Sequence, residues 1–265
     1  MLFRSGFSPE WLTLREPFDA AARSRALAQR FAEALPPAPR IADLGGGTGS
    51  NVRYLAPLVP GARWRVVDAD PVLLAEAAKR TAQIETLRYD LNGDLRSLFG
   101  ACDGVVTSAL LDLTSAPWFD RLGSALALRQ LPFLAALSVD GRIEFDPPAP
   151  HDRIIVAAFA QHQRGDKGFG SALGLGAIEH LATRLQALGY EVVTEPSDWR
   201  IGANDQPMLR QYLDGVIGAA IDAAPERRAQ IASWSVMRRQ QASDGALSVR
   251  VGHRDILATY RRRRA

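Results

Sequence analysis

Two periodicities of apolar and polar residues alternate along this chain, and they define its predicted elements. Short apolar runs typical of buried strands lie near residues 40–44, 63–68, 84–89, 103–108, 141–146, 190–195 and 247–253. The stretches between these runs show helical spacing, so strands and helices follow one another in turn. This alternation predicts an α/β fold, with a parallel sheet and crossover helices on both of its faces.

A further helix is predicted before the first strand. Residues 17–35 are rich in alanine, their larger apolar residues recur near helical spacing, and Pro36 and Pro37 end the stretch. We therefore expect an N-terminal helical cap over residues 1–39, packed over a ligand-binding mouth, and a core over residues 40–265. Four charged residues lie on or beside this cap: Arg15, Asp19, Arg23 and Arg25.

A long insertion from residue 202 to residue 244 separates the sixth and seventh predicted strands. Its apolar residues recur at helical spacing in two groups, one from Leu209 to Ala220 and one from Ile231 to Met237. Two amphipathic helices here form either a lid over a small substrate or a homodimer interface, and the apolar stripe does not distinguish the two. Within the first group, Tyr212 is a candidate substrate contact.

The chain's most informative motif is the glycine run within residues 41–51, which follows the first strand. Gly45, Gly47 and Gly49 alternate with other residues, and Asp68 ends the next strand. Glycines at a strand end let the backbone approach a ligand closely, and an acid at the end of the second strand can hold a ribose diol. The two features together predict a nucleoside-binding pocket.

Details of the glycine run distinguish between nucleoside ligands. A dinucleotide fingerprint requires G-x-G-x-x-G, but Ser50 stands where its third glycine would be. The carboxylate of Asp43 would repel a pyrophosphate and would favour ammonium and sulfonium charges. The chain also lacks the P-loop pattern and the Y-x-x-x-K pattern of a hydride-transfer site. These observations disfavour an NAD-dependent oxidoreductase.

The pattern D-x-G-x-G-x-G after a first strand resembles motif I of the class I S-adenosylmethionine-dependent methyltransferases. Later landmarks fall in the order of that family: Asp68 within VVDADP, Asp90 within RYDLNGDL, and the segment DGVVTSALLDL at the fourth strand and its loop. The resemblance implies S-adenosylmethionine as the cofactor. It implies nine cofactor-binding residues: Asp43, Gly45, Gly47, Gly49, Asp68, Ala69, Asp90, Leu91 and Ser108.

The resemblance also implies a topology. In this family a Rossmann-like sheet of seven strands has the order 3-2-1-4-5-7-6, with the last strand antiparallel between the fifth and the sixth. Ligands of such sheets bind at the carboxyl ends of the strands near the switch point, where the glycine run lies. The core of residues 40–265 is expected to adopt this mostly parallel sheet with helices on both faces.

Residues for the methyl acceptor are sought after the fourth and fifth strands. The N-P-P-[YF] pattern of many enzymes that methylate nucleic-acid bases is absent after the fourth strand. In that loop Asp112 either accepts a proton or caps a helix, and Trp118 either stacks on a planar substrate or packs in the core. Arg23 in the N-terminal cap either binds a substrate carboxylate or faces solvent.

The segment His162–Gly170 is dense in charged residues and glycines, as binding loops often are. There His162 can take a proton from the acceptor, and Lys167 or Arg164 can hold an anionic substrate. The alternative is a solvated turn with local hydrogen bonds. The other three histidines are interpreted as structural: His151, His180 and His253. The four histidines lack metal-ligand spacing, so no metal is expected.

Composition limits the remaining classes of function. The formal net charge is +3, and Arg261–Arg264 alone supply four positive charges, so the rest of the chain carries −1. A near-neutral body disfavours nucleic acid as a partner. The single cysteine excludes an internal disulfide. The N-terminal residues lack an apolar secretion signal, and no apolar run approaches the length of a membrane span, so we expect a cytoplasmic protein without membrane attachment.

These observations predict a methyltransferase that acts on an O or N nucleophile of a small molecule. Few catalytic residues are needed, because the sulfonium is already a good leaving group and the protein mainly aligns the reactants. Two alternatives stay open: an RNA- or protein-directed methyltransferase, and a non-catalytic protein that binds an adenosine nucleoside.

Overall fold

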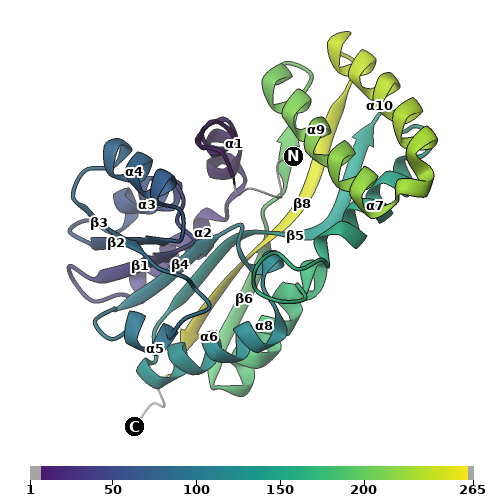
Figure 1. Cartoon of the computed structure of the whole chain (residues 1–265). Coiled ribbons are helices and arrows are strands. Elements are labelled where there is room, and N and C mark those ends of the chain that lie inside the picture. Colours follow the sequence, from purple (N-terminus) through teal and green to yellow (C-terminus); the bar gives the residue numbers. More distant parts are fainter. Residues whose placement is uncertain (1–6, 262–265) are drawn as a thin grey trace.

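A computed structural model describes residues 7–261 as one sheet with helices on both faces and an extended arm (Figure 1). The strands are β1 (Arg40–Leu44), β2 (Arg63–Asp68), β3 (Ile84–Arg88), β4 (Gly104–Ser108), β5 (Phe133–Asp146), β6 (Tyr190–Pro196), β7 (Trp199–Ile201) and β8 (Ser248–Tyr260). The α-helices are α1 (Pro9–Ala22), α2 (Arg25–Glu33), α3 (Ser50–Leu55), α4 (Pro71–Arg80), α5 (Leu95–Leu98), α6 (Ala116–Arg129), α7 (Asp152–Gln163), α8 (Ala177–Ala187), α9 (Gln206–Ala223) and α10 (Arg228–Ser243).

The strand order is β3-β2-β1-β4-β5-β8-β6. Strands β1 to β5 pair in parallel, and β8 runs antiparallel between β5 and β6. Because β8 is the last strand of the chain, this arrangement confirms the expected Rossmann-like order 3-2-1-4-5-7-6. The predicted number of seven strands was wrong by one: the short strand β7 pairs with β8 and makes the sheet eight-stranded.

Side chains alternate between the two faces of the sheet and pack into two separate cores. On one face α2, α3 and α4 cover a core that includes Ile41, Val106 and Leu257. On the other face α5, α6 and α8 cover a core that includes Ala42 and Val105. The one-residue offset between Ile41 and Ala42 is the period-two alternation of a strand buried on both faces.

The arm contains a third core, which the sequence did not predict as a unit. Strands β5 and β8 continue past the parallel sheet, and α7, α9 and α10 pack against their extension at the upper right of Figure 1. The apolar residues of this core include Phe145, Leu213 and Trp234. Helix α1 and strand β7 also contribute to it, so the N-terminal segment joins the arm to the rest of the molecule.

Two element boundaries differ from the sequence prediction. The single helix expected over residues 17–35 is two helices, because the side chains of Ser8 and Ser24 each accept a hydrogen bond from a first-turn backbone N–H and begin α1 and α2 separately. Strand β5 begins at Phe133, eight residues before the predicted start. The apolar run that opens β5 lacks a period-two pattern because it is buried on both faces.

The insertion of residues 202–244 contains α9 and α10, which pack against each other and against the arm. No helix within residues 7–261 combines the length and the hydrophobicity needed to cross a bilayer.

A buried ion pair holds α10 on the arm. Arg238 is fully buried, and its guanidinium donates two hydrogen bonds of 2.6 Å to the carboxylate of Asp152 at the start of α7. The same guanidinium lies 4.9 Å from the ring centre of Phe145 and donates to the carbonyl oxygen of Pro147. This cluster joins α10, α7 and β5.

We predict that Arg238→Ala lowers the free energy of unfolding by about 3–5 kcal/mol, because it leaves the Asp152 carboxylate without its main partner. The neighbouring Arg239, whose exposed ion pair with Asp214 is solvated, is the matched control, and Arg239→Ala should cost at most about 1 kcal/mol. Urea unfolding of both variants measures the difference. Equal losses would show that the buried pair does not stabilise the arm.

Candidate active site

Two adjoining cavities lie where the parallel sheet meets the arm. The larger, of about 340 Å³, is bounded by the turn after β1 and by the carboxyl ends of β2, β3 and β4. The smaller, of about 90 Å³, lies between α1, α7, α9 and the extended parts of β5 and β8. Four residues line both cavities and so mark their junction: Phe7, Arg15, Ala109 and Leu113.

The glycine run forms the tight turn that opens the larger cavity. Gly45 and Gly47 have φ of 61° and 53°, which favour glycine, and both line the cavity. A Cβ at Gly46 would lie 2.7 Å from Oδ2 of Asp43, so a side chain there would displace the carboxylate. Gly49, with φ of 79°, precedes α3 and does not line the cavity.

Asp43 lies beneath this turn in a chain of hydrogen bonds. Its Oδ1 accepts from Nδ2 of Asn51 at 2.9 Å, and Oδ1 of Asn51 accepts from Arg23 at 3.0 Å. Oδ2 of Asp43 is buried and has no partner among the described residues. Burial raises the pKa of Asp43 to about 7. A buried carboxylate oxygen without a partner, at a cavity wall, is suited to the ammonium group of a ligand.

Arg23 was predicted to contact the substrate, and the structure places it elsewhere. Its guanidinium donates to Asn51 and, at 2.9 Å, to Oγ of Ser108 at the end of β4. Its side chain lines neither of the two cavities. Arg23 therefore supports the turn from behind, and the serine it holds is one of the predicted cofactor residues.

Asp68 ends β2 at the opposite wall of the larger cavity. Its carboxylate accepts hydrogen bonds from the backbone N–H groups of Gly47 and Asp70, each at 2.9 Å. These bonds fix the carboxylate beside the turn, and burial raises its pKa. Eight of the nine predicted cofactor residues line this cavity: Asp43, Gly45, Gly47, Asp68, Ala69, Asp90, Leu91 and Ser108.

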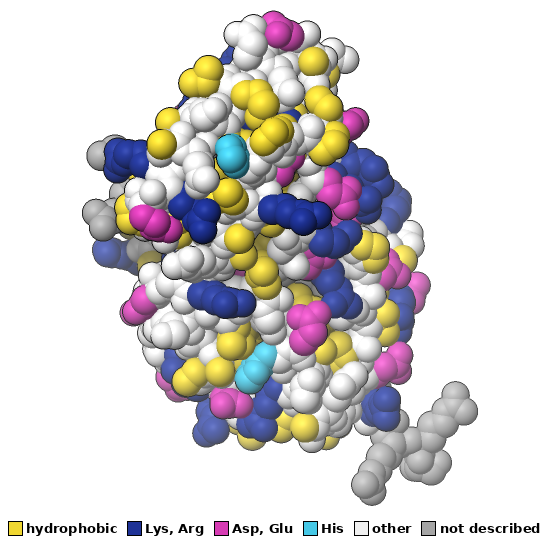
Figure 2. All heavy atoms as spheres, turned by 90° about the vertical axis from the view of Figure 1, so that its right-hand side faces the viewer, with side chains coloured by type: hydrophobic (Ala, Val, Ile, Leu, Met, Phe, Trp, Pro, Cys, Tyr) yellow, Lys and Arg dark blue, Asp and Glu magenta, His cyan; other side chains and the backbone are white. Residues whose placement is uncertain are grey.

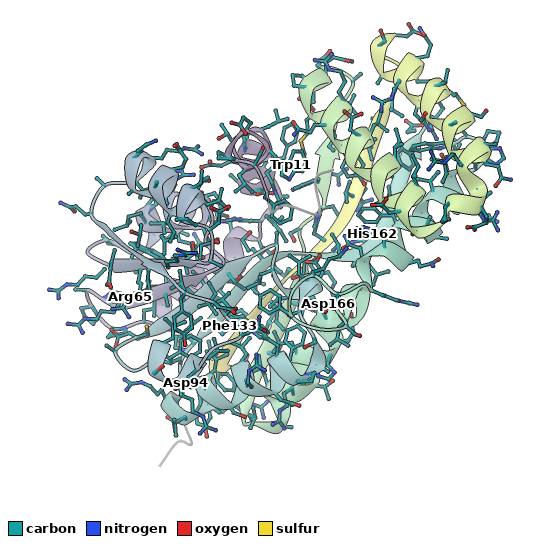
Figure 3. All side chains as sticks on the ribbon, in the orientation of Figure 1. Trp11, Arg65, Asp94, Phe133, His162 and Asp166 are labelled. Carbon is teal, nitrogen blue, oxygen red and sulfur yellow. The ribbon has the colours of Figure 1, made fainter. Side chains whose placement is uncertain are left out.

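Aromatic side chains enclose the smaller cavity. They come from separate segments of the chain: Phe7, Trp11, Phe159, Trp199, Tyr212 and His253. Trp11 lies on α1 between the sheet and the arm (Figure 3). Its ring meets that of Trp199 edge to face at a centroid distance of 6.3 Å. Sequence patterns indicated only Asp112 and Tyr212 as candidate site residues of this wall, because the wall is assembled from distant segments.

An ion pair forms part of this wall. Arg15 and Asp19, both on α1, pair at 3.0 Å and are both buried. Asp19 also accepts a hydrogen bond of 3.0 Å from Nε1 of Trp199, and the Arg15 guanidinium lies 4.8 Å from the Trp199 ring centre. The charge of Arg15 is therefore balanced within the protein.

Three polar groups face the smaller cavity. Asp112, in the short 3-10 helix Leu111–Leu113, is 5 % exposed, and burial raises the pKa of its carboxyl to about 6. The hydroxyl of Tyr212 and Oε1 of Gln163 are buried without a partner among the described residues. Of the predicted residues, Asp112 and Tyr212 meet here. Gln163 was not predicted, because the prediction for this segment rested on its charged residues and on His162, and Gln163 is uncharged.

The segment around His162 is arranged differently from the prediction. His162 and Gln163 are the last residues of α7 and not part of a loop, and His162 lines neither cavity. Nδ1 of His162 lies 3.2 Å from Nζ of Lys167, and Lys167 lines the larger cavity. An effect of His162 on the cavity must therefore pass through Lys167. Figure 3 shows His162 at the arm, with Asp166 in the loop beyond it.

Trp118 packs in the core and does not meet a substrate. It is fully buried on α6, and its Nε1 donates to the carbonyl oxygen of Leu91 at 2.9 Å. Of the two roles predicted for Trp118, the structure therefore agrees with core packing and not with stacking on a substrate. By holding the Leu91 backbone, Trp118 supports the cavity wall indirectly.

The position of β8 between β5 and β6 decides the fold. The strand order is the Rossmann-like order 3-2-1-4-5-7-6 that the sequence resemblance predicted. No family model matches the chain, and no curated protein matches it.

Solved structures are similar at low identity. The [4+2]-cyclase SpnF has 18 % identity and a TM-score of 0.45, over 89 % of this chain and 80 % of that one. A methyltransferase from Thiobacillus denitrificans, in complex with S-adenosyl-L-homocysteine, has 14 % identity and a TM-score of 0.44. The match covers 96 % of this chain and 99 % of that one. Mycolic acid cyclopropane synthase CmaA1 has 14 % identity and a TM-score of 0.47. The match covers 88 % of this chain and 83 % of that one.

His253, interpreted from sequence as structural, lines the smaller cavity. It is buried against Trp199, with a ring-centroid distance of 4.8 Å, and burial lowers its pKa to about 4. The folded state therefore binds this proton less well than the unfolded state does. The resulting stabilisation is complete above pH 6.5 and is lost as the pH falls toward 4.

We predict that His253 contributes about 3 kcal/mol to this loss of stability between pH 6.5 and pH 4. Unfolding free energies of the wild type and of His253→Phe across that range measure the contribution as a difference. The difference is needed because the raised pKa values of Asp43 and Asp112 increase the stability of the folded state as the pH falls. This opposite effect is common to both proteins, so subtracting the two curves removes it. His180→Phe, on α8, is the control, and a His253→Phe curve parallel to the wild type would contradict the prediction.

Proposed function

We propose that this chain is an S-adenosylmethionine-dependent methyltransferase that acts on an O or N nucleophile of a small molecule. The observation that carries the proposal is the larger cavity. It has the glycine turn and an unpartnered carboxylate oxygen of Asp43 at one wall, and Asp68 at the next. It opens directly onto a second cavity where an acceptor can bind.

The residues of the larger cavity suit the parts of this cofactor. Oδ2 of Asp43 is available to its ammonium group, and the proposal assigns Asp68 to the ribose hydroxyls and Asp90 to the adenine amino group, because both carboxylates line the cavity. Bound there, S-adenosylmethionine supplies a methyl group activated by the sulfonium charge. The protein's task is then to align an acceptor atom with that methyl group and to exclude water.

A small molecule is favoured as the acceptor by the enclosed position of the second cavity, which α1, α7 and α9 surround. The face in Figure 2 gives no support to a nucleic-acid partner, because basic and acidic side chains occur side by side on it. The arginine run at residues 262–264 lies outside the described residues. Helix α9 lines the smaller cavity, as a lid over an acceptor would, whereas α10 lines neither cavity. A homodimer stays an alternative for the outer face of the two helices.

We predict micromolar binding of S-adenosylmethionine and S-adenosylhomocysteine and no binding of NAD, measured by isothermal titration calorimetry. Asp68→Ala should weaken cofactor binding by about 1–3 kcal/mol, because it removes charge-assisted hydrogen bonds to the ribose. Asp120→Ala, which changes an exposed ion pair on α6, is the matched control and should bind as the wild type does.

Binding of NAD alone, or of none of the three, would contradict the proposal. Binding of S-adenosylhomocysteine without methyl transfer to any small acceptor would favour a non-catalytic nucleoside-binding protein. Undiminished affinity in a folded Asp68→Ala variant would remove Asp68 from the site.

A further inference from the structure

The volume of the smaller cavity limits the size of the molecule that it can bind. Its volume of about 90 Å³ is below that of an apolar cavity of about 150 Å³ that holds benzene. A single small ring therefore fills this space and extends to the junction with the larger cavity. A polar group on that ring would lie at the junction with the larger cavity, where Arg15, Ala109 and Leu113 line both.

The wall favours a flat, uncharged ring. Six aromatic side chains line the cavity, and aromatic faces and edges pack well on a further ring. Among the described residues that line the cavity, Arg15 is the side chain with a permanent positive charge, and its ion pair with Asp19 balances that charge. The other basic side chain, His253, is uncharged near neutral pH because burial lowers its pKa to about 4. An anionic substrate thus finds no unbalanced positive charge in this wall.

Besides Arg15, Gln211 and His253, the polar residues that line the wall are Asp112, Gln163 and Tyr212, and each of these three can accept a hydrogen bond. Oε1 of Gln163 and the hydroxyl of Tyr212 are more than nine-tenths buried and have no partner among the described residues. The hydrogen bond at the Asp112 carboxyl comes from its own backbone N–H. Buried acceptors without donors are costly, so a ligand that brings a donor is favoured here.

We propose that the smaller cavity binds a neutral aromatic ring bearing a hydroxyl group, a phenol, and that Asp112 accepts the phenol's proton. The assignment of the bound phenol as methyl acceptor rests on the proposed function; the binding site itself does not. A hydroxyl is preferred over an amine because a neutral amine attacks without first losing a proton, whereas a hydroxyl benefits from a base.

The proton transfer is simple to balance. The O–H bond of the phenol breaks, its electron pair stays on the phenol oxygen, and the proton forms a bond to a carboxylate oxygen of Asp112. The oxygen then carries the charge needed to attack a methyl group. Charged groups facing Asp112 are Arg15 from α1 and Lys167 from the loop after α7, and both favour its carboxylate form. His253 and Tyr212 line the same cavity without charge near neutral pH.

The binding test titrates the cofactor-free protein with phenol, toluene and benzoate as matched probes. Ligand-observed NMR measures the affinity of each probe. We expect phenol to bind at least tenfold more tightly than toluene, which lacks the donor, and than benzoate, which brings a charge. Phenol affinity should fall below about pH 6, where the Asp112 carboxylate takes up a proton and becomes a weaker, uncharged hydrogen-bond acceptor.

Two variants assign the roles of single residues. Tyr212→Phe should lower phenol affinity about five-fold and leave toluene affinity unchanged, with Tyr260→Phe on β8 as the matched control. Asp112→Asn should abolish the decline in phenol affinity below pH 6. With S-adenosylmethionine present, it should also lower turnover at least a hundredfold, a loss typical of removing a general base. Asp120→Asn is its control.

The outcomes separate this inference from the proposed function. Phenol binding with the expected pH dependence, in a protein that fails to bind S-adenosylhomocysteine, would uphold the site and reject the methyltransferase. Binding of S-adenosylhomocysteine with equal affinities for phenol, toluene and benzoate would reject the phenol site. An Asp112→Asn variant with the wild-type pH dependence and turnover would reject Asp112 as the proton acceptor.

Discussion

The antiparallel pair of β5 and β8 is the constraint on which the rest of the structure depends. These two long strands belong to all three cores: Phe133 and Ile256 to one face of the sheet, Leu134 and Leu257 to the other, and the residues beyond them to the arm. A change in their register would shift every wall of the smaller cavity, because a slip of one residue exchanges the two faces of a strand.

One buried carboxylate fixes this register. Asp255 of β8 accepts hydrogen bonds of 2.8 Å from the backbone N–H of Leu137, in an irregular part of β5, and from that of Ser24, just before α2. Leu137 has φ of 59°, an unusual value for a residue with a branched side chain. Its N–H is turned from the regular ladder and finds Asp255 instead. The result is a bend at the mouth of the cavity, held by an acid that also fixes the N-terminal segment.

The larger cavity could be predicted from sequence because its parts are local. The glycine turn, Asp43 and Asp68 belong to one β-α-β unit, where spacing along the chain determines the position in space. The parallel strands near 40–44, 63–68 and 103–108 were readable for a similar reason, because each is a short apolar run bounded by turn residues. The early start of β5 was hidden by burial on both faces.

The smaller cavity could not be predicted because no local pattern encodes it. Trp11, Gln163 and Trp199 lie far apart in the sequence and meet only because the arm folds back over α1. The segment His162–Gly170 was predicted as a site because it is dense in charged residues, and within it His162 was favoured over the neighbouring Gln163. A buried polar group without a partner is a property of the fold and not of a motif, so it becomes visible only with the structure.

This division has a physical consequence for how the site is built. The turn after β1 belongs to one unit of the sheet, and Arg23 at the end of α1 supports it through Asn51 and Asp43. The smaller cavity depends on the arm, on α1 and on the ion pair of Arg15 with Asp19 all at once. Substitutions in α9 or β7 therefore change which molecule fits beside the turn while leaving Asp43 and Asp68 in place. The arm thus shapes the smaller cavity, and the sheet shapes the larger one.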